Sequence, residues 1–359
     1  MEMGNRNIII ASSGTGGHIY PGIALAEEFK NKGYNPIFFI SNNTASIKIL
    51  KNSGFEYIEF NVSGMPGGIS FLFITFLVKM KFSFFKALIK IVKLDPLAVI
   101  GTGGYIAVPV LFAAKILHKK TFIHEQNAIP GKANILLNKI TDKTFISFQS
   151  SEKYFKKKNT ILSNYPVRKN ILSVSKEKIL RELKFENGIF TVLVFGGSLG
   201  AVKLNEVACE TLLKLSFKNR IQVLHITGSG NYIKIQEKIG DNPDYRVFEY
   251  MHDIGAAYAA SDVVVCRSGA GSVFELKALD KPAVLVPYLY AADNHQYWNA
   301  KEIEKDGKVI IIEEKNLAKE SLSNAIYALK ENIKSNTAES IIKFPRKLVF
   351  EEIIKCMKS

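Results

Sequence analysis

Short apolar runs alternate with longer amphipathic segments along the whole chain. Each run has about the length of one β-strand, whereas apolar positions in the segments between the runs recur every three or four residues. This alternation predicts an α/β fold, in which helices cover both faces of parallel sheets. The predicted strands are residues 7–12, 36–41, 57–62, 97–101, 120–125 and 144–147, followed by residues 191–195, 221–227, 245–250, 262–266, 283–287 and 309–312.

A glycine-rich turn follows the first predicted strand of each half of the chain. GTGGH at residues 14–18 follows the strand at 7–12, and GGSLGA at residues 196–201 follows the strand at 191–195. Glycines at such turns let backbone N–H groups approach a ligand, and the next helix points its positive end to the same place. Taken singly, neither loop is specific, and a tight turn without a ligand is the alternative. Together they predict two Rossmann-like domains that face a central cleft.

The alternating pattern breaks near Pro166, about half-way along the 359 residues. We therefore predict an N-terminal domain of residues 1–165 and a C-terminal domain of residues 166–339. A last helix at about residues 340–359 is predicted to return to the first domain. A chain of this length suits two domains.

Residues 68–93 combine many phenylalanines and aliphatic residues with five lysines and no acidic residue. On a helix most of these lysines share one narrow stripe, with an apolar face opposite. An ordinary helix that packs its apolar face inward is the alternative, but the apolar content exceeds one core-facing stripe. We therefore predict contact with a membrane surface. The residues predicted to make it are Phe73, Leu77, Lys79, Phe84, Lys86 and Lys90.

The charge balance also favours an anionic partner. Lys and Arg number 48 against 33 Asp and Glu, a formal net charge of +15, which suits a membrane surface, nucleic acid or phosphorylated ligands. A lysine-rich background composition is the alternative. Because the basic residues accompany phenylalanines in one helical block, we expect no nucleic-acid partner. The three cysteines have no paired spacing, which is typical of a reducing compartment and argues against disulfides and structural zinc.

Polar residues with chemical potential follow several predicted strands. In the second half, a small-residue turn after residues 262–266 is followed by Glu275, about one turn into the next helix. A carboxylate there can accept hydrogen bonds from both hydroxyls of a ribose, while the turn's N–H groups face a diphosphate. The alternative for Glu275 is favourable pairing with the helix N-terminus. The amides and imidazole of residues 294–296 suit sugar hydroxyls, and HEQN at residues 124–127 follows a strand of the first half. The sequence has no Asp-x-Asp pair for a metal-held diphosphate, so we predict neither a metal nor a cofactor.

Six motifs occur in an order that resembles the MurG family of N-acetylglucosaminyltransferases. They are GTGGH at 14–18, GTGGY at 101–105, HEQN at 124–127, GGSLGA at 196–201, CRSGA at 266–270 and HQYWNA at 295–300. The resemblance covers nearly the whole chain and implies a GT-B fold. It also implies inverting transfer of N-acetylglucosamine from UDP-N-acetylglucosamine to the C4 hydroxyl of the N-acetylmuramyl-pentapeptide on undecaprenyl diphosphate (lipid I), giving lipid II in peptidoglycan synthesis. The implied location is the cytoplasmic face of the bacterial plasma (inner) membrane, as a peripheral protein near anionic lipids and other cell-wall synthesis proteins.

The resemblance also assigns roles to individual residues. The implied donor-binding residues are Thr15, Gly16, Gly17, Asn127, Arg168, Ser198, Gly200, Met251, Ala270, Glu275, His295 and Gln296. Among them, Arg168 and Ser198 would contact the diphosphate and Glu275 the ribose. The acceptor side would include Thr15, His18 and Tyr105.

Two residues compete as the general base that removes the proton of the attacking hydroxyl. His18 is the first candidate because an imidazole titrates near neutral pH, and Glu125 is the second. An orienting or acceptor-binding role is the alternative for His18. Inversion fits a single displacement, so no covalent nucleophile is required. Backbone N–H groups, helix dipoles and Arg168 would stabilise the departing diphosphate.

Other function classes remain as alternatives. A UDP-sugar:diacylglycerol transferase would share the fold and the membrane contact, and the choice of acceptor would distinguish it. A sugar-nucleotide sensor would bind the donor without turnover. A dehydrogenase is disfavoured because neither glycine loop has the GxGxxG pattern.

Overall fold

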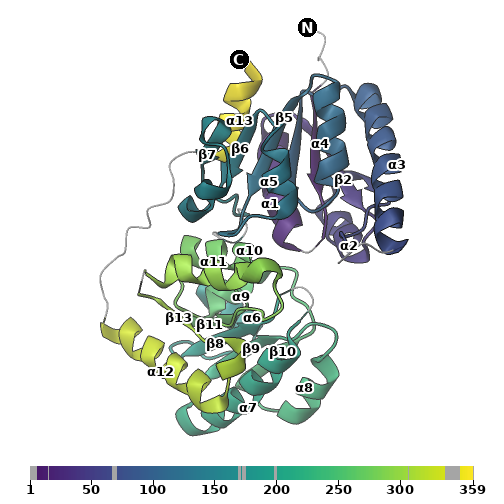
Figure 1. Cartoon of the computed structure of the whole chain (residues 1–359). Coiled ribbons are helices and arrows are strands. Elements are labelled where there is room, and N and C mark those ends of the chain that lie inside the picture. The colour runs from purple at the N-terminus through teal and green to yellow at the C-terminus, as the bar shows by residue number, and fades with distance from the viewer. Residues whose placement is uncertain are drawn as a thin grey trace. The chain divides into compact units, whose positions relative to one another are not determined.

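The computed structural model describes residues 6–14, 16–66, 71–168, 171, 175–197, 200–305, 307–335 and 348–358. The chain divides into two compact units. Unit 1 comprises Met1–Pro166 and Phe344–Ser359, and unit 2 comprises Val167–Lys343. Each has a parallel sheet with helices on both faces (Figure 1), so the predicted pair of Rossmann-like domains is confirmed.

Unit 1 holds a seven-stranded sheet in the order β3-β2-β1-β4-β5-β6-β7. Its strands are β1 (Asn7–Ser12), β2 (Asn35–Ser41), β3 (Glu56–Phe60), β4 (Ala98–Gly103), β5 (Lys120–Glu125), β6 (Lys143–Ile146) and β7 (Thr160–Leu162). Its helices are α1 (Gly16–Asn31), α2 (Thr44–Ser53), α3 (Phe71–Leu94), α4 (Ala107–Ile116), α5 (Lys132–Leu137) and α13 (Val349–Lys358), with 3-10 turns η1 (Gln149–Tyr154) and η2 (Lys157–Asn159). The order reverses between β1 and β4, and ligands bind at such a switch point in doubly wound folds.

Unit 2 holds a six-stranded sheet in the order β10-β9-β8-β11-β12-β13. Its strands are β8 (Thr191–Phe195), β9 (Gln222–Ile226), β10 (Tyr245–Phe248), β11 (Val263–Cys266), β12 (Ala283–Leu285) and β13 (Val309–Ile311). Its helices are α6 (Lys176–Glu182), α7 (Val202–Asn219), α8 (Tyr232–Ile239), α9 (Ile254–Ala260), α10 (Ala270–Ala278), α11 (His295–Glu304) and α12 (Lys319–Ser335), with 3-10 turns η4 (Ala292–Asn294) and η5 (Glu314–Asn316). Here the order reverses between β8 and β11.

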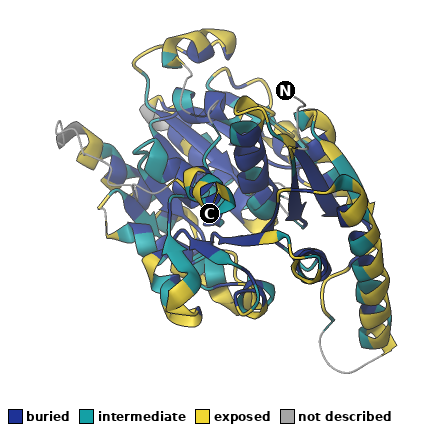
Figure 2. Cartoon of the chain, turned by 90° about the horizontal axis from the view of Figure 1, so that it is seen from above, coloured by how far each residue is buried: buried dark blue, intermediate teal, exposed yellow. Residues whose placement is uncertain are grey.

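The central strands of both sheets are buried, whereas the edge strands β3 and β7 are more accessible, and most exposed positions lie on helices and loops (Figure 2). In unit 1 the alternating side chains of β1 divide between two cores: Ile8 and Ile10 face one, and Ile9 and Ala11 face the other. In unit 2 the alternate residues Val192 and Val194 of β8 enter one core cluster. Burial on both faces is why these strands read as continuous apolar runs.

Two features differ from the prediction for unit 1. The strand β7 was not predicted, because its three residues carry no apolar run of strand length. The last helix begins at Val349, and residues 340–347 of its predicted range lie outside the described residues. The helix does return to unit 1, where the Phe350 ring packs edge-on against Phe29 at 4.9 Å between centroids and the Val349 amide donates to Asn164 Oδ1.

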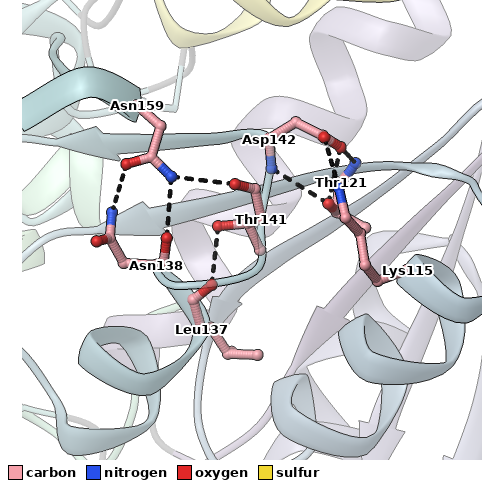
Figure 3. A network of polar contacts seen from close by, with 7 residues as sticks. All are labelled: Lys115, Thr121, Leu137, Asn138, Thr141, Asp142 and Asn159. Carbon is pink, nitrogen blue, oxygen red and sulfur yellow. Dashed lines mark hydrogen bonds and ion pairs between the residues drawn. The ribbon is translucent and has the colours of Figure 1, made fainter. Parts of the chain in front are cut away.

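A polar network holds the loops that precede β6 and β7 (Figure 3). Asp142 Oδ2 accepts from the backbone and hydroxyl of Thr121, and Lys115 Nζ pairs with Asp142 Oδ1 at 2.7 Å. Asn159 Nδ2 donates to the carbonyls of Asn138 and Thr141. These side chains satisfy backbone groups at the start of β5 and in the loop before β6. Asn159 immediately precedes β7 and thereby ties this edge strand, which hydropathy alone does not specify, to the loop before β6.

Candidate active site

His18 lies on the first turn of α1, directly after the glycine turn that follows β1. Its ring packs against Gly103 at the end of β4, where φ is +124° and an added Cβ would lie 2.2 Å from His18 Nδ1. Only glycine combines that dihedral angle with that close approach. The two glycine motifs of unit 1 therefore serve one purpose here, which is to seat this imidazole at the switch point of the sheet.

Gln126, which immediately follows β5, contacts the same imidazole. Its Nε2 lies within hydrogen-bonding distance of His18 Nδ1, and Gln126 itself is buried. An amide nitrogen can only donate, so in this arrangement Nδ1 accepts and the neutral ring carries its proton on Nε2. Gln126 belongs to the HEQN motif, but no separate role was predicted for it.

Glu125, the second candidate base, is buried at the end of β5 and accepts four hydrogen bonds. Asn127 donates to Oε1 from its backbone N–H at 2.8 Å and from Nδ2 at 3.2 Å. Oε2 accepts from the Gly131 N–H at 3.0 Å and from Asn134 Nδ2 at 2.9 Å. Burial raises the pKa of Glu125, and these hydrogen bonds oppose the rise. The carboxylate thus holds the loop from Gln126 to Gly131.

The other predicted residues of unit 1 surround the same strand ends. Gly16 is buried and Gly17 half-buried in the first turn of α1. Tyr105 follows β4, and its ring meets Phe76 of α3 edge-on at 5.8 Å between centroids. Thr15 lies outside the described residues.

Glu275 is the centre of the predicted site in unit 2. It lies on α10, whose first residue is Ala270, and it is 8% exposed. Arg168 Nη2 donates to its Oε1 at 3.1 Å, and the Tyr258 hydroxyl donates to its Oε2 at 3.0 Å. Burial raises the pKa of Glu275, while Arg168 and Tyr258 oppose the rise. The structure thus brings Arg168 and Glu275 together, and it adds Tyr258, a residue in an alanine-rich helix that no sequence motif marks.

The glycine turn after β8 brings its backbone close to a neighbouring strand. Gly200 has φ +77°, and an added Cβ would lie 2.7 Å from the Thr227 carbonyl oxygen at the end of β9. Ser198 lies outside the described residues. Met251 is half-buried in the loop between β10 and α9.

The predicted sugar-binding residues lie at the start of α11. Gln296 Oε1 accepts from the Tyr288 N–H at 3.0 Å, and His295 Nδ1 lies 2.8 Å from the Ala292 carbonyl oxygen. Asp293 is left-handed, with φ +50°, and Asn294, which precedes the helix, makes no side-chain cap.

Arg267 and Glu314 support the loop between β12 and α11, and neither residue was predicted from the sequence. Arg267 donates to the Val286 and Pro287 carbonyls and pairs with Glu314, whose other oxygen accepts from the Leu289 N–H. Arg267 was visible inside the CRSGA motif, whereas Glu314 stands in no motif.

Helix α3 has two apolar faces. Phe76, Ala87 and Ile91 are buried, and Met80 and Phe84 are partly buried against the same core. Large apolar side chains recur at three- or four-residue intervals on the exposed side: Phe71, Ile74, Val78, Phe82, Phe85, Ile89 and Val92.

The residues predicted to contact a membrane divide between these faces. Leu77 is exposed, whereas Phe73 and Phe84 are half-buried, and Phe84 packs toward the core. Lys86 Nζ donates to the Glu59 carbonyl at 2.7 Å, and Lys79 and Lys90 are half-buried. Phe84 packs against the core, whereas its neighbours Phe82 and Phe85 are exposed. The exposed aromatic surface is therefore formed by neighbours of the predicted residues.

Comparison with known proteins places this architecture in a family. Models of the glycosyltransferase family 28 N-terminal and C-terminal domains match residues 8–146 and 191–353. The chain belongs to glycosyltransferase family 28. The resemblance drawn from the six motifs is thereby confirmed, and the alternative of a dehydrogenase is wrong.

Several relatives that match nearly the whole chain carry the same name. A UDP-N-acetylglucosamine--N-acetylmuramyl-(pentapeptide) pyrophosphoryl-undecaprenol N-acetylglucosamine transferase of Caldanaerobacter subterraneus subsp. tengcongensis is 40% identical over 90% of this chain and 91% of its own. The protein of the same name from Desulforamulus reducens is 36% identical over 98% and 97%. The crystal structure of Acinetobacter baumannii MurG covers 98% of this chain and 99% of its own, with a TM-score of 0.71 at 22% identity, and shares the fold.

Among the described residues, no helix is both long enough and apolar enough to cross a membrane. No group of three His, Cys, Asp or Glu side chains among them is arranged to hold a metal ion.

Proposed function

We propose that this family 28 glycosyltransferase moves N-acetylglucosamine from UDP-N-acetylglucosamine to the N-acetylmuramyl-pentapeptide of lipid I, giving lipid II with inversion at the anomeric carbon. The name shared by relatives up to 40% identical over nearly the full chain supports this activity. The structural observation that carries the proposal is the buried Glu275 carboxylate beside the small-residue turn that opens α10.

In this proposal unit 2 binds the donor. The ribose hydroxyls donate to Glu275, and the diphosphate lies near the N-terminus of α10, where backbone N–H groups and the helix dipole favour negative charge. Arg168 contacts Glu275 in the structure, and its guanidinium has further donors for the diphosphate. Ser198, Gly200 and Met251 remain predicted donor contacts, as do Ala270, His295 and Gln296.

Unit 1 binds the acceptor and supplies the base in this proposal. Glu125 is the weaker candidate, because each of its oxygens already accepts two hydrogen bonds from its own loop. His18 can act as base through Nε2 when Nδ1 carries the proton. A rotation of the Gln126 amide by about 180° presents its oxygen to Nδ1 and allows that tautomer. Thr15 and Tyr105 remain predicted acceptor contacts. Gly16, Gly17 and Asn127 remain predicted contacts of the donor.

The exposed apolar face of α3 supports peripheral attachment to the cytoplasmic membrane surface. An apolar helical face beside lysines can enter the headgroup layer while the cations meet anionic lipids. Such attachment would place unit 1 at the surface that carries the lipid-linked acceptor. Cell-wall synthesis proteins remain possible partners.

The test is release of UDP from UDP-N-acetylglucosamine, measured in detergent with and without a short-chain lipid I analogue and with EDTA present. We expect release that depends on the acceptor and persists in EDTA, because the proposed site stabilises the leaving group without a metal. Glu275→Ala should raise KM for the donor, whereas the control Glu249→Ala, at an exposed position of the same unit, should not. Donor binding without release would favour a sensor, and release with diacylglycerol would favour the other transferase.

A further inference from the structure

The groups around Glu275 determine whether this carboxylate is ionised and how its two oxygens are oriented. A carboxylate that accepts from two neighbouring hydroxyls must be ionised and must hold both oxygens in place. Burial works against ionisation, because it removes water from the charge. The charged or titratable groups that act on Glu275 are Arg168, Tyr258 of α9 and Cys266 of β11. Burial raises the pKa of the Cys266 thiol, so it stays neutral, and the support comes from Arg168 and Tyr258.

Tyr258 is held in place independently of Glu275. It is fully buried, and its ring meets Phe195 edge-on at 5.8 Å between centroids. Phe195 is the last residue of β8, immediately before the glycine turn. The other end of α9 is fixed by Asp253, whose side chain accepts from the Ala256 N–H. Burial raises the pKa of the Tyr258 phenol well above its usual value, so the hydroxyl remains a donor at every physiological pH.

The two carboxylate oxygens of Glu275 have enough hydrogen-bond acceptor positions for both hydroxyls of a diol. Each carboxylate oxygen has about two acceptor positions. Oε1 uses one for Arg168 and Oε2 uses one for Tyr258. One position on each oxygen suits one of two adjacent hydroxyls, which is the pattern that a ribose presents.

We propose that Tyr258 is a positioning residue for ribose recognition, which orients the Glu275 carboxylate toward the 2′ and 3′ hydroxyls of the donor nucleotide. It acts through Glu275 and does not itself contact the nucleotide. This inference rests on the proposed function, since it assumes that unit 2 binds a uridine nucleotide. It predicts that loss of the phenolic hydroxyl harms recognition of the diol more than it harms any other part of donor binding.

The experiment compares Tyr258→Phe with the wild-type full-length enzyme. Binding of UDP and of 2′-deoxy-UDP is measured by calorimetry, and kinetic constants are measured with UDP-N-acetylglucosamine. We expect UDP binding to weaken about tenfold, as for loss of one hydrogen bond to a charged group. 2′-Deoxy-UDP should weaken much less, so discrimination between the two falls. KM for the donor should rise while kcat stays within about twofold.

The pH dependence provides a second readout. Without the Tyr258 hydroxyl, the pKa of Glu275 rises further, so UDP affinity should fall at a higher pH on acidification than in the wild type. Tyr245→Phe is the matched control. Tyr245 is another buried tyrosine of unit 2, and its hydroxyl lies 2.9 Å from His225 Nδ1, away from Glu275. This control should leave UDP binding and its pH dependence unchanged.

A purely structural role for Tyr258 would weaken UDP and 2′-deoxy-UDP equally and would overturn the inference. Unchanged UDP binding in Tyr258→Phe would do the same. The double variant Glu275→Ala, Tyr258→Phe is a further test, because it should bind UDP as Glu275→Ala alone does. An additional loss in the double variant would contradict action through Glu275. Failure of the wild type to bind UDP at all would instead reject the proposed function.

Discussion

Replacing Glu125 with glutamine distinguishes two roles of this residue: anchoring the loop from Gln126 to Gly131, or acting as the catalytic base. Gln has nearly the same shape, but one of its two terminal atoms is an NH2 group that cannot accept. Two of the four donors now satisfied by Glu125 would then face another donor: either both groups of Asn127, or the Gly131 N–H and Asn134 Nδ2. The loop that carries Gln126 would lose half of its support.

The expected cost follows from the burial of these groups. An unsatisfied buried donor costs about 1–3 kcal/mol. Removing the burial penalty of the charge, which raises the pKa of Glu125, offsets part of that cost. We therefore expect the free energy of unfolding of unit 1 to fall by about 2 kcal/mol. At about 2–4 °C per kcal/mol for a unit of this size, its Tm should fall by about 4–8 °C.

Scanning calorimetry and steady-state kinetics on the same preparations test this reasoning. We expect Glu125→Gln to lower Tm by that amount and to lower kcat only moderately, by about tenfold, through misplacement of Gln126 and His18. The control Glu56→Gln, at an exposed position of β3, should change neither. An unchanged Tm together with a kcat loss of about a thousandfold or more would refute the anchor and restore Glu125 as the base.

Three further predictions concern unit 1. Gly103→Ala should lower kcat about a hundredfold, because its Cβ would lie 2.2 Å from His18 Nδ1. The control Gly54→Ala also has positive φ, but no atom lies within 4 Å of its added Cβ, so it should lower only stability. Equal losses of kcat in the two variants would contradict the role of the close approach. Gln126→Glu should shift the acid limb of the kcat/KM profile to higher pH, because a carboxylate beside Nδ1 favours the imidazolium, and an unmoved limb would exclude that contact from catalysis. Phe82→Ser should weaken sedimentation with anionic vesicles about tenfold without changing turnover in detergent, since this ring is 71% exposed on α3, and unchanged sedimentation would exclude this face as the membrane contact.

Hydropathy was sufficient for the central strands of the two sheets, because these strands are buried on both faces. Such strands have no polar alternation, and β1, β8 and β11 stand out as apolar runs bounded by polar or glycine residues. The edge strand β7 escaped prediction, because its place depends on the asparagine and aspartate network around Asn138 and Asp142 rather than on its own composition.

The sequence likewise indicated most of the candidate site, because the glycine turns follow strands, Glu125 ends a strand, and His18 and Glu275 lie on the helices that follow such turns. It placed His18 before Glu125 only because an imidazole titrates near neutral pH. Their difference lies in hydrogen bonds made by Asn127, Gly131 and Asn134, whose donors converge on Glu125 only in the folded chain.

In helix α3 too, the sequence predicted the composition of the surface but not which residues form it. Its composition revealed more apolar residues than one core contact can bury, but a period of 3.6 residues cannot say which face the core will take. Packing decided that Phe84 turns inward and Phe82 outward.

The sequence by itself thus determined the α/β class, the two-domain order and the family, because strand-length apolar runs and ordered motifs are local properties of the chain. Only the tertiary structure decided which polar atoms meet. The pairing of Tyr258 with Glu275, of Gln126 with His18 and of Arg267 with Glu314 joins residues of different segments of the chain. Such contacts arise from the packing of helices onto the sheets, and the periodicity of a single segment carries no record of them.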